Sequence, residues 1–189
     1  MNADVLKGGF AAAPVDAAHA FRAAMNAIAR PGTIESICGA MPPAPMSEAA
    51  GGLVLTLCDP DTPLHLAGNW DCKEVREWIA FHVGAPIVAP GEAMFALGDW
   101  ASLTPLAQYA IGTPEYPDRS ATLIVEREMM EPGDAVLRGP GIKTSTVMSL
   151  PEVAAFQKNA TLFPLGLDFF FTCGSKVSGL PRTTKVEAA

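Results

Sequence analysis

The sequence predicts an α/β fold in which helices and buried strands form layers. Three observations support this class. Segments of about ten to fifteen residues carry helix-capping and helix-period patterns, shorter apolar runs are bounded by glycine, proline or acidic residues, and the two kinds of segment alternate along the chain. Short continuous apolar runs are typical of strands that are covered on both faces. A sandwich or a helical bundle would not show this alternation.

The first predicted helix is capped by Asp16. Phe21, Met25 and Ile28 follow at spacings of four and three residues, which puts them on one helical face. The sequence RPG at residues 30–32 ends the helix, because a residue before proline leaves the helical region and the following glycine suits a turn.

The next segments alternate between core and turn. Ser47 is a candidate helix cap, and residues 53–57 are core whose uniformly apolar character does not distinguish a helix from a strand. The sequence DPDTP at residues 59–63 predicts a turn, because proline fixes φ and aspartate can bond its own backbone. Residues 64–66 are predicted to be extended.

Two further helices are predicted from capping-box patterns. Asp71 with Glu74 begins the first of them, and Ser149 with Glu152 begins the second, which runs to residues 163–164. The first has an apolar face made of Val75, Trp78, Ile79 and His82. Strands are predicted at residues 94–97, 122–125, 135–137 and 167–172, with a tight turn at residues 139–141.

The length of 189 residues predicts one domain, residues 1–189, because domains are typically about 100–150 residues long. Its 17 glycines and 17 prolines separate elements rather than form a low-complexity region. The proline-rich stretch at residues 41–45 is the one shift in composition. We interpret it as a loop, since the roughly 40 residues before it are too few to bury a core alone.

The balance of charge excludes several classes of protein. Thirteen Lys and Arg against 20 Asp and Glu give a net charge of −7, which disfavours an extended nucleic-acid surface. No stretch of about 18 residues lacks both charge and proline, so no membrane span is predicted. Residues 1–4 lack the basic start of an export signal, which predicts a cytoplasmic protein. The low charged fraction of 17% also predicts a surface partly covered by another copy or subunit.

The four cysteines are predicted to be free and mostly buried thiols. They form no CxxC pair and have no histidine at zinc-ligand spacing beside them, so no metal site is expected there. They are Cys38, Cys58, Cys72 and Cys173.

No motif carries chemistry by itself. Asp59 and Asp61 could bind a divalent cation or act as an acid and base pair, but their interleaved prolines favour turn chemistry. Lys176 could form a Schiff base only if it were buried, and a solvated turn lysine is favoured. The three histidines are widely spaced, and His82, on the apolar face of its helix, is interpreted as a satisfied core residue.

Cations in loops beside strand ends are the candidates for holding an anion. Lys143 follows the GPG turn and precedes three hydroxyl residues, although the turn lacks the spacing of a phosphate loop. Arg119 lies on a loop that leads into a buried strand. Arg182 lies in the sequence LPRTTK at residues 180–185, which is either an anion clamp or a frayed tail.

Six short segments match one family in the same order along the chain. They are the helix end at residues 21–32, LTLCDPDTPL at 55–64, YP and SATL within 116–123, GPGI at 139–142, FPLGLD at 163–168 and LPRTT at 180–184. Each motif is weak alone, but their order over about residues 9–186 is specific. The chain therefore resembles the PhnH family of phosphonate metabolism proteins, the H subunits of the carbon–phosphorus (C–P) lyase system.

This resemblance implies a three-layer αβα fold with an open mixed sheet, similar to the major domain of pyridoxal-phosphate (PLP)-dependent transferases but without PLP. It implies a homodimer in isolation that joins the G, I and J subunits of the lyase complex. With the G, I and L subunits, such proteins are required for an alkylphosphonate to displace adenine from ATP, giving a ribose 1-phosphonate 5-triphosphate.

The resemblance identifies no catalytic residue in this chain and implies no cofactor. We therefore predict a subunit that organises the synthase while another subunit supplies the nucleosidase chemistry. The alternatives are a catalytically inert scaffold or ligand-binding subunit, and a PLP enzyme that uses Lys176. Because an anionic substrate needs cations in loops next to strand ends, we predict that it is bound by Arg30, Arg119, Lys143 and Arg182.

Overall fold

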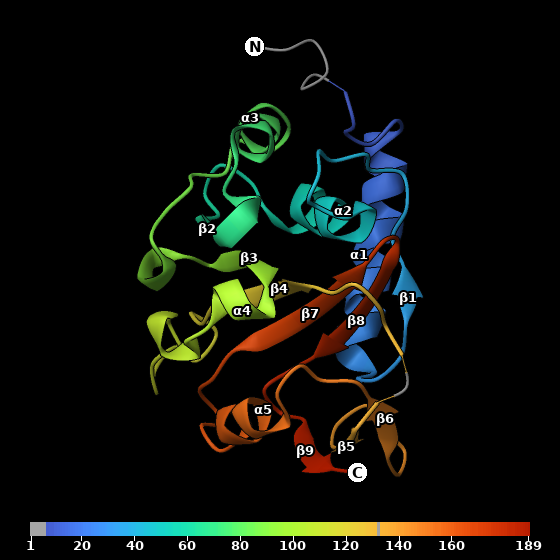
Figure 1. Ribbon diagram of the computed structural model, residues 1–189, viewed down its shortest axis with the longest axis vertical. Helices are drawn as coiled ribbons and strands as arrows, with labels where there is room; N and C mark the ends of the chain where they lie inside the picture. The colour runs from blue at the N-terminus through green and yellow to red at the C-terminus, as the bar shows by residue number, and fades with distance from the viewer. Residues whose placement is uncertain (1–6, 132) are drawn as a thin grey trace.

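A six-stranded mixed sheet lies at the centre of the computed structural model, which describes residues 7–131 and 133–189 (Figure 1). Its strands are β1 (Glu35–Ser36), β2 (Leu64–Leu66), β3 (Phe95–Asp99), β4 (Thr122–Glu126), β7 (Asp168–Cys173) and β8 (Lys176–Leu180). The spatial order is β1-β8-β7-β4-β3-β2, with β2, β3, β4 and β7 parallel to one another, β8 antiparallel to β7, and β1 antiparallel to β8. The predicted α/β class is confirmed. Residues 1–4, on which the export-signal prediction rests, lie outside the described residues.

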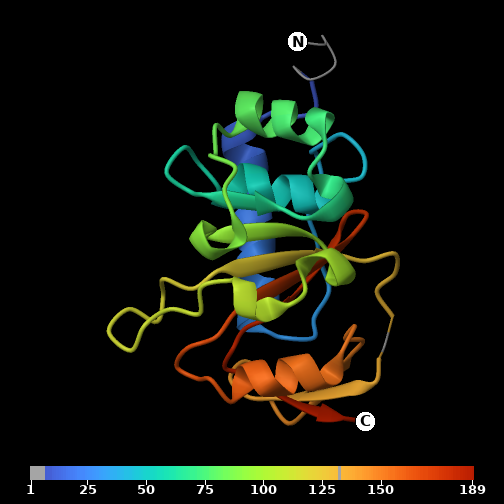
Figure 2. The same cartoon turned by 60° about the vertical axis from the view of Figure 1, so that its left-hand side comes forward.

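Three helices cover one face of this sheet (Figure 2). They are α1 (Ala13–Ala29), α2 (Glu48–Leu57) and α3 (Lys73–His82). Leu53 of α2 and Trp78 of α3 are buried there with Ile124 and Phe170 of the sheet. Residues 53–57, whose apolar run did not distinguish helix from strand, are therefore the second half of α2, with Leu53 and Val54 buried and residues 55–57 half-buried.

The opposite face is covered by two short helices and a second sheet. The helices are α4 (Trp100–Leu103) and α5 (Val153–Ala160), and the sheet has the antiparallel order β6 (Thr146–Met148), β5 (Ala135–Arg138), β9 (Lys185–Ala188). Short 3-10 helices lie at η1 (Gly68–Trp70), η2 (Pro90–Glu92) and η3 (Leu106–Gln108). The interpretation of residues 180–185 as a frayed tail is wrong, because they lead into β9, whose Val186 is buried against this face.

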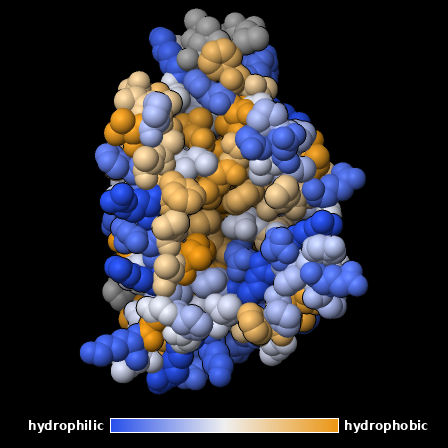
Figure 3. Space-filling view, turned by 180° about the vertical axis from the view of Figure 1, so that it is seen from behind, coloured by the Kyte–Doolittle hydropathy of each residue, from blue (hydrophilic) through white to orange (hydrophobic). Residues whose placement is uncertain are grey.

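Helix α1 buries a different face from the one its large apolar residues mark. Its buried residues are Ala20, Ala23, Ala24 and Ala27, whereas the side chains of Phe21 and Met25 are 49% and 53% exposed. The reason is close packing: a Cβ built on Gly179 of β8 would lie 2.6 Å from the backbone oxygen of Ala27, so only small side chains fit between helix and sheet. From the side opposite Figure 1, a band of apolar side chains is exposed on the surface (Figure 3).

Three of the four predicted helix caps are wrong. Ser47 does cap α2, accepting a hydrogen bond from the Ala50 N–H at 3.2 Å. Asp16 lies inside α1, where it accepts from the N–H of Ala12. Asp71 instead pairs with Arg76, and the Ser149 Oγ accepts a hydrogen bond from Arg127 at 3.3 Å. The side-chain oxygens of Asp71 and Ser149 thus accept hydrogen bonds from arginine side chains, and that of Asp16 accepts from a backbone N–H before the helix.

The prediction of free thiols is confirmed, but the prediction that most are buried is wrong. Cys58 is buried, Cys72 and Cys173 are partly buried, and Cys38 is exposed. Burial raises the pKa of Cys58 to about 12. Among the helices of the described residues, none is both long and apolar enough to cross a membrane.

Candidate functional site

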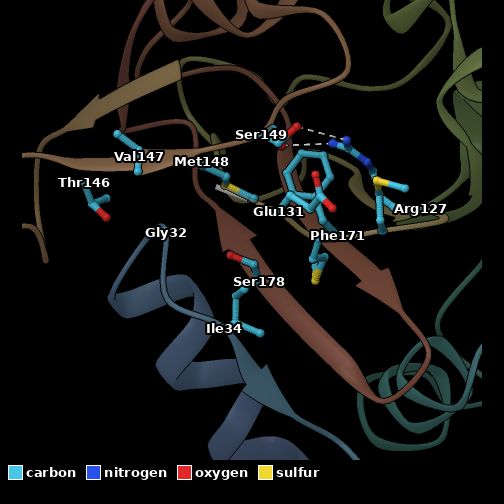
Figure 4. Close-up of a pocket in the computed structure, with 12 residues that line it drawn as sticks. Gly32, Ile34, Arg127, Glu131, Thr146, Val147, Met148, Ser149, Phe171 and Ser178 are labelled. Carbon is cyan, nitrogen blue, oxygen red and sulfur yellow. Dashed lines mark hydrogen bonds between the residues drawn. The ribbon is translucent and has the colours of Figure 1, made fainter. Parts of the chain in front are cut away.

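A cavity of about 290 Å³ lies where the edge of the main sheet meets the second sheet (Figure 4). Its floor is formed by β7 and β8, and one wall by the segment that follows β4. The other walls are formed by β6 and by the turn between α1 and β1. Residues far apart in the sequence therefore line one small space, which is about the size at which small-molecule sites begin.

Ser178 is the polar residue on the cavity floor. It pairs with Phe171 across β7 and β8, and the two side chains point to the same face of the sheet. Ser178 is 2% exposed, and its Oγ has no hydrogen-bond partner within the described residues. In Figure 4 this hydroxyl points toward the space between Gly32 and Met148. A buried hydroxyl without a partner is unfavourable, so its position needs an explanation.

Arg127 is the cation of the cavity. Its N–H continues the ladder beyond β4 by bonding to the backbone oxygen of Thr172 at 2.8 Å. The guanidinium donates to the backbone oxygen of Ser149 at 2.9 Å and to Ser149 Oγ at 3.3 Å. An arginine side chain has five N–H donors, so three have no partner within the described part of the chain.

Sequence reasoning missed both of these residues. Arg127 follows a strand that was predicted at residues 122–125, and loops at the carboxyl ends of parallel strands often form sites, so that signal was present. Ser178 carried no comparable signal, because its environment depends on the pairing of β8 with β7 and β1.

Two of the predicted anion-binding residues lie on segments that meet beside the cavity. Arg30 ends α1, and Lys143 lies in the turn between β5 and β6; both are exposed. A Cβ built on Gly141 would lie 1.9 Å from the backbone oxygen of Ala29, so the turn crosses the end of α1 in direct contact. The same two segments provide Gly32 and Thr146 to the cavity wall.

Arg182 is held inside the molecule at the amino-terminal edge of the parallel strands. Its guanidinium donates to both carboxylate oxygens of Asp168, to the backbone oxygen of Pro117 at 2.6 Å, and to Ser120 Oγ. Only 13% of its side chain is exposed. The segment it holds includes Arg119, which is exposed and lies 4.1 Å from the centre of the Tyr116 ring.

The other candidates have local roles. The Asp59 carboxylate accepts from the Thr62 hydroxyl at 2.6 Å and from the Asp61 N–H at 2.9 Å, which lowers the pKa of Asp59 and confirms the turn. Lys176 is exposed at the first position of β8. Nε2 of His82 lies 3.1 Å from a backbone oxygen, at the edge of the core rather than in its centre. No group of three or more His, Cys, Asp and Glu within residues 7–131 and 133–189 is arranged to hold a metal ion.

Glu126 is a buried carboxylate at the carboxyl end of β4. One oxygen accepts from the Ser47 N–H at 2.6 Å, and the other lies 3.0 Å from the Thr172 hydroxyl, which donates to it. Burial raises the pKa of Glu126 and outweighs the lowering by these hydrogen bonds. The residue joins α2 to the sheet.

Replacing Glu126 with glutamine is expected to flatten the pH dependence of stability. In the unfolded chain the carboxyl ionises near pH 4.5, whereas the folded protein keeps its proton to a higher pH. Wild-type stability from this group is therefore present at low pH and is lost as pH rises from about 4.5 through the raised pKa. Urea denaturation at pH 4 and pH 8 checks this, with the exposed Glu128→Gln as control. Parallel pH profiles for wild type and Glu126→Gln would contradict it.

Comparison with known proteins gives a consistent result over nearly the whole chain. Residues 8–187 match the family model described as bacterial phosphonate metabolism protein (PhnH). The chain is 42% identical over 195 residues to the alpha-D-ribose 1-methylphosphonate 5-triphosphate synthase subunit PhnH of Rhizobium meliloti (strain 1021), with 98% of each chain covered. It is 30% identical over 200 residues to the putative C-P lyase subunit protein HtxG of Stutzerimonas stutzeri, with 94% of each covered. Both relatives are named as subunits.

Proposed function

The chain belongs to the PhnH family of bacterial phosphonate metabolism proteins, and on this premise we propose that it is an accessory subunit of the C–P lyase system for organic phosphonate catabolism. It acts without PLP. Together with partner subunits, it is required to transfer the ribose triphosphate of ATP to an alkylphosphonate with release of adenine. The observation that carries the proposal is the 42% identity, across 98% of both chains, to a protein named as a subunit of a ribose 1-methylphosphonate 5-triphosphate synthase.

The reaction sets clear chemical requirements. A phosphonate oxygen forms a bond to the anomeric carbon of the ribose, the bond from that carbon to adenine breaks, and the base leaves with a proton. Cations must hold the triphosphate and the phosphonate, and an acid must protonate the leaving base. In this proposal another subunit supplies the acid, and this chain contributes cations.

Four cations are proposed to serve the anionic substrate in two ways. Arg30, Arg119 and Lys143 are exposed and thus accessible to an anion. The sequence predicts that Arg182 binds the substrate directly. Because its guanidinium is already paired with Asp168, Pro117 and Ser120, we propose that it acts instead as a positioning residue that holds the segment on either side of Arg119.

The proposed partners are a second copy of the chain in isolation, and the G, I, J and L subunits in the complex. The apolar side chains that α1 leaves exposed, Val15, Phe21 and Met25, support an assembled state, since exposed apolar patches tend to mark interfaces. We further propose a single cytoplasmic domain related in fold to the PLP-dependent transferases. The exposure of Lys176 supports the absence of PLP, because a Schiff-base lysine needs a depressed pKa, commonly obtained by burial.

The function is tested by reconstitution from purified subunits with ATP and methylphosphonate. We expect no adenine release from this chain alone, and release by the mixture of subunits that depends on adding this chain. Turnover by the isolated chain, or full activity without it, would contradict the accessory role.

The cation assignment is tested with single alanine variants in the same mixture. Arg30→Ala, Arg119→Ala and Lys143→Ala are expected to lower adenine release without lowering thermal stability, whereas Lys73→Ala, an exposed change on α3, leaves release unchanged. An inert scaffold is the second candidate, favoured by the exposed apolar face of α1. It predicts that the three variants remain fully active and that the isolated chain binds neither ATP nor phosphonate.

A further inference from the structure

We propose that the cavity beside Ser178 is a binding site for a small organic anion in which a short apolar chain separates the charged group from a second polar atom. The geometry of the cavity carries this inference. It rests on the proposed function only in one respect, that a substituted alkylphosphonate is the member of this ligand class a PhnH subunit would meet.

Ser178 defines the polar end of the site. Its hydroxyl is aimed into the cavity, its side chain is 98% removed from solvent, and the described residues offer its Oγ no partner. Ile34, Met148 and Phe171 line the cavity around it and have no polar side-chain atom that could bond strongly. A ligand that places a hydroxyl or amine here satisfies a group that the protein leaves unpaired.

Arg127 defines the charged end. Ser149 takes two of its N–H groups and so fixes the plane of the guanidinium, leaving the others for an anion. Arginine matches carboxylate and phosphonate oxygens by paired hydrogen bonds, and such charge-assisted bonds are the strong ones. Glu131, the acidic residue of the lining, is exposed, so solvent screens its repulsion of the ligand.

The space between the two ends is apolar and adaptable. Phe171, Met129, Met130 and Met148 line it, and methionine adjusts its shape to the ligand that it contacts. Ser178 of β8 and Arg127, just after β4, line the cavity from different elements and are drawn well apart in Figure 4. A ligand that reaches both must therefore carry a short apolar chain, and a volume of about 290 Å³ restricts it to a small molecule.

Calorimetric titration of the isolated chain tests the site with four probes. They are inorganic phosphate, 1-propanol, propylphosphonate and 3-hydroxypropylphosphonate. Phosphate has the charge alone, 1-propanol has an apolar chain with a hydroxyl, propylphosphonate has the charge with an apolar chain, and 3-hydroxypropylphosphonate has all three features. We expect 3-hydroxypropylphosphonate to bind most tightly, propylphosphonate about fivefold more weakly, and the other two weakest, since one hydrogen bond contributes about a factor of five.

Variants separate the contributions of the two ends. Ser178→Ala is expected to weaken 3-hydroxypropylphosphonate about fivefold, to leave propylphosphonate unchanged, and to leave the folded state as stable as wild type or more so, because it removes an unpaired buried hydroxyl. Arg127→Gln weakens both phosphonates by tenfold or more, and Arg127→Lys restores part of the loss. The matched control is Ser145→Ala, an exposed serine in the turn between β5 and β6.

Each outcome decides the proposal. If none of the four probes binds, the site is rejected. It is also rejected if Ser178→Ala destabilises the chain without weakening 3-hydroxypropylphosphonate. Adenine release by the reconstituted mixture separates this failure from failure of the proposed function. If release depends on adding the chain but no probe binds, the proposed function is upheld and the site is rejected. The opposite result upholds the site and rejects the function. In that case the probes bind the wild type and its variants with the expected affinities, but adenine release by the mixture does not depend on adding this chain.

Discussion

Replacing Arg182 with methionine is expected to lower the free energy of unfolding by about 3 kcal/mol, the lower end of the range for breaking a buried ion pair. The change leaves the carboxylate of Asp168 without its cation at the amino-terminal end of β7. It also removes the donors to the backbone oxygen of Pro117 and to Ser120 Oγ. Methionine keeps much of the length of the arginine stem, so the loss measures the guanidinium rather than the packing of the chain.

Urea denaturation measures this loss of stability. Two further variants test whether the loss comes from the ion pair between Arg182 and Asp168. Arg182→Met combined with Asp168→Asn is expected to recover part of the stability, because the buried charge is then gone from both sides. Arg119→Met removes an exposed cation over an aromatic ring and costs less than about 1 kcal/mol. Equal losses for Arg119→Met and Arg182→Met would show that Arg182 does not hold this edge of the sheet.

Replacing Gly179 with alanine is expected to destabilise the protein by about 3 kcal/mol, the upper end of the usual range for overpacking. The added Cβ would lie 2.6 Å from the backbone oxygen of Ala27, 2.7 Å from its carbonyl carbon and 2.8 Å from the backbone nitrogen of Ile28. All three are backbone atoms of a helix, which cannot rotate away as a side chain does. Relief requires that α1 move away from β8, which opens the core on that face.

Gly91→Ala is the matched control. A Cβ at Gly91 would have its nearest neighbour at 3.6 Å, which is ordinary contact, so the same chemical change is expected to alter stability by less than about 0.5 kcal/mol. The midpoints of urea denaturation of the two variants give the comparison. A Gly179→Ala protein as stable as Gly91→Ala would mean that the close approach of α1 to β8 is not maintained in solution.

For α1, the sequence pattern predicted the helix but not the face that packs against the sheet. The sequence predicts the helix and its end at residues 30–32, and it places Phe21, Met25 and Ile28 on one face, but the structure leaves Phe21 and Met25 exposed. The packing face is made of alanines, because glycine and alanine are what two backbones need in order to approach closely. A hydrophobic period cannot report that requirement, since it ranks a phenylalanine above an alanine.

For the candidate site, too, the sequence predicted some features and missed others. Charge and turn chemistry are local properties, so the sequence alone could place Arg30, Arg119, Lys143 and Arg182 in loops beside strand ends, and their binding of an anion stays a prediction. It did not show that the carboxylate for Arg182 comes from Asp168, or that Arg127 and Ser178 share a cavity. These relations join residues 14 and 51 positions apart in the chain.

The sequence by itself therefore determined the α/β class, the turns, the cap at Ser47, the low charge and the family. Each of these depends on residue type and on spacing over a few positions. Only the tertiary structure decided which face of α1 is buried, that the C-terminal segment forms a strand, and that a hydroxyl and a guanidinium line one cavity. The physical reason is that these features arise from strand pairing and from the close approach of backbones, which bring distant residues into contact and leave their partners to be set by packing.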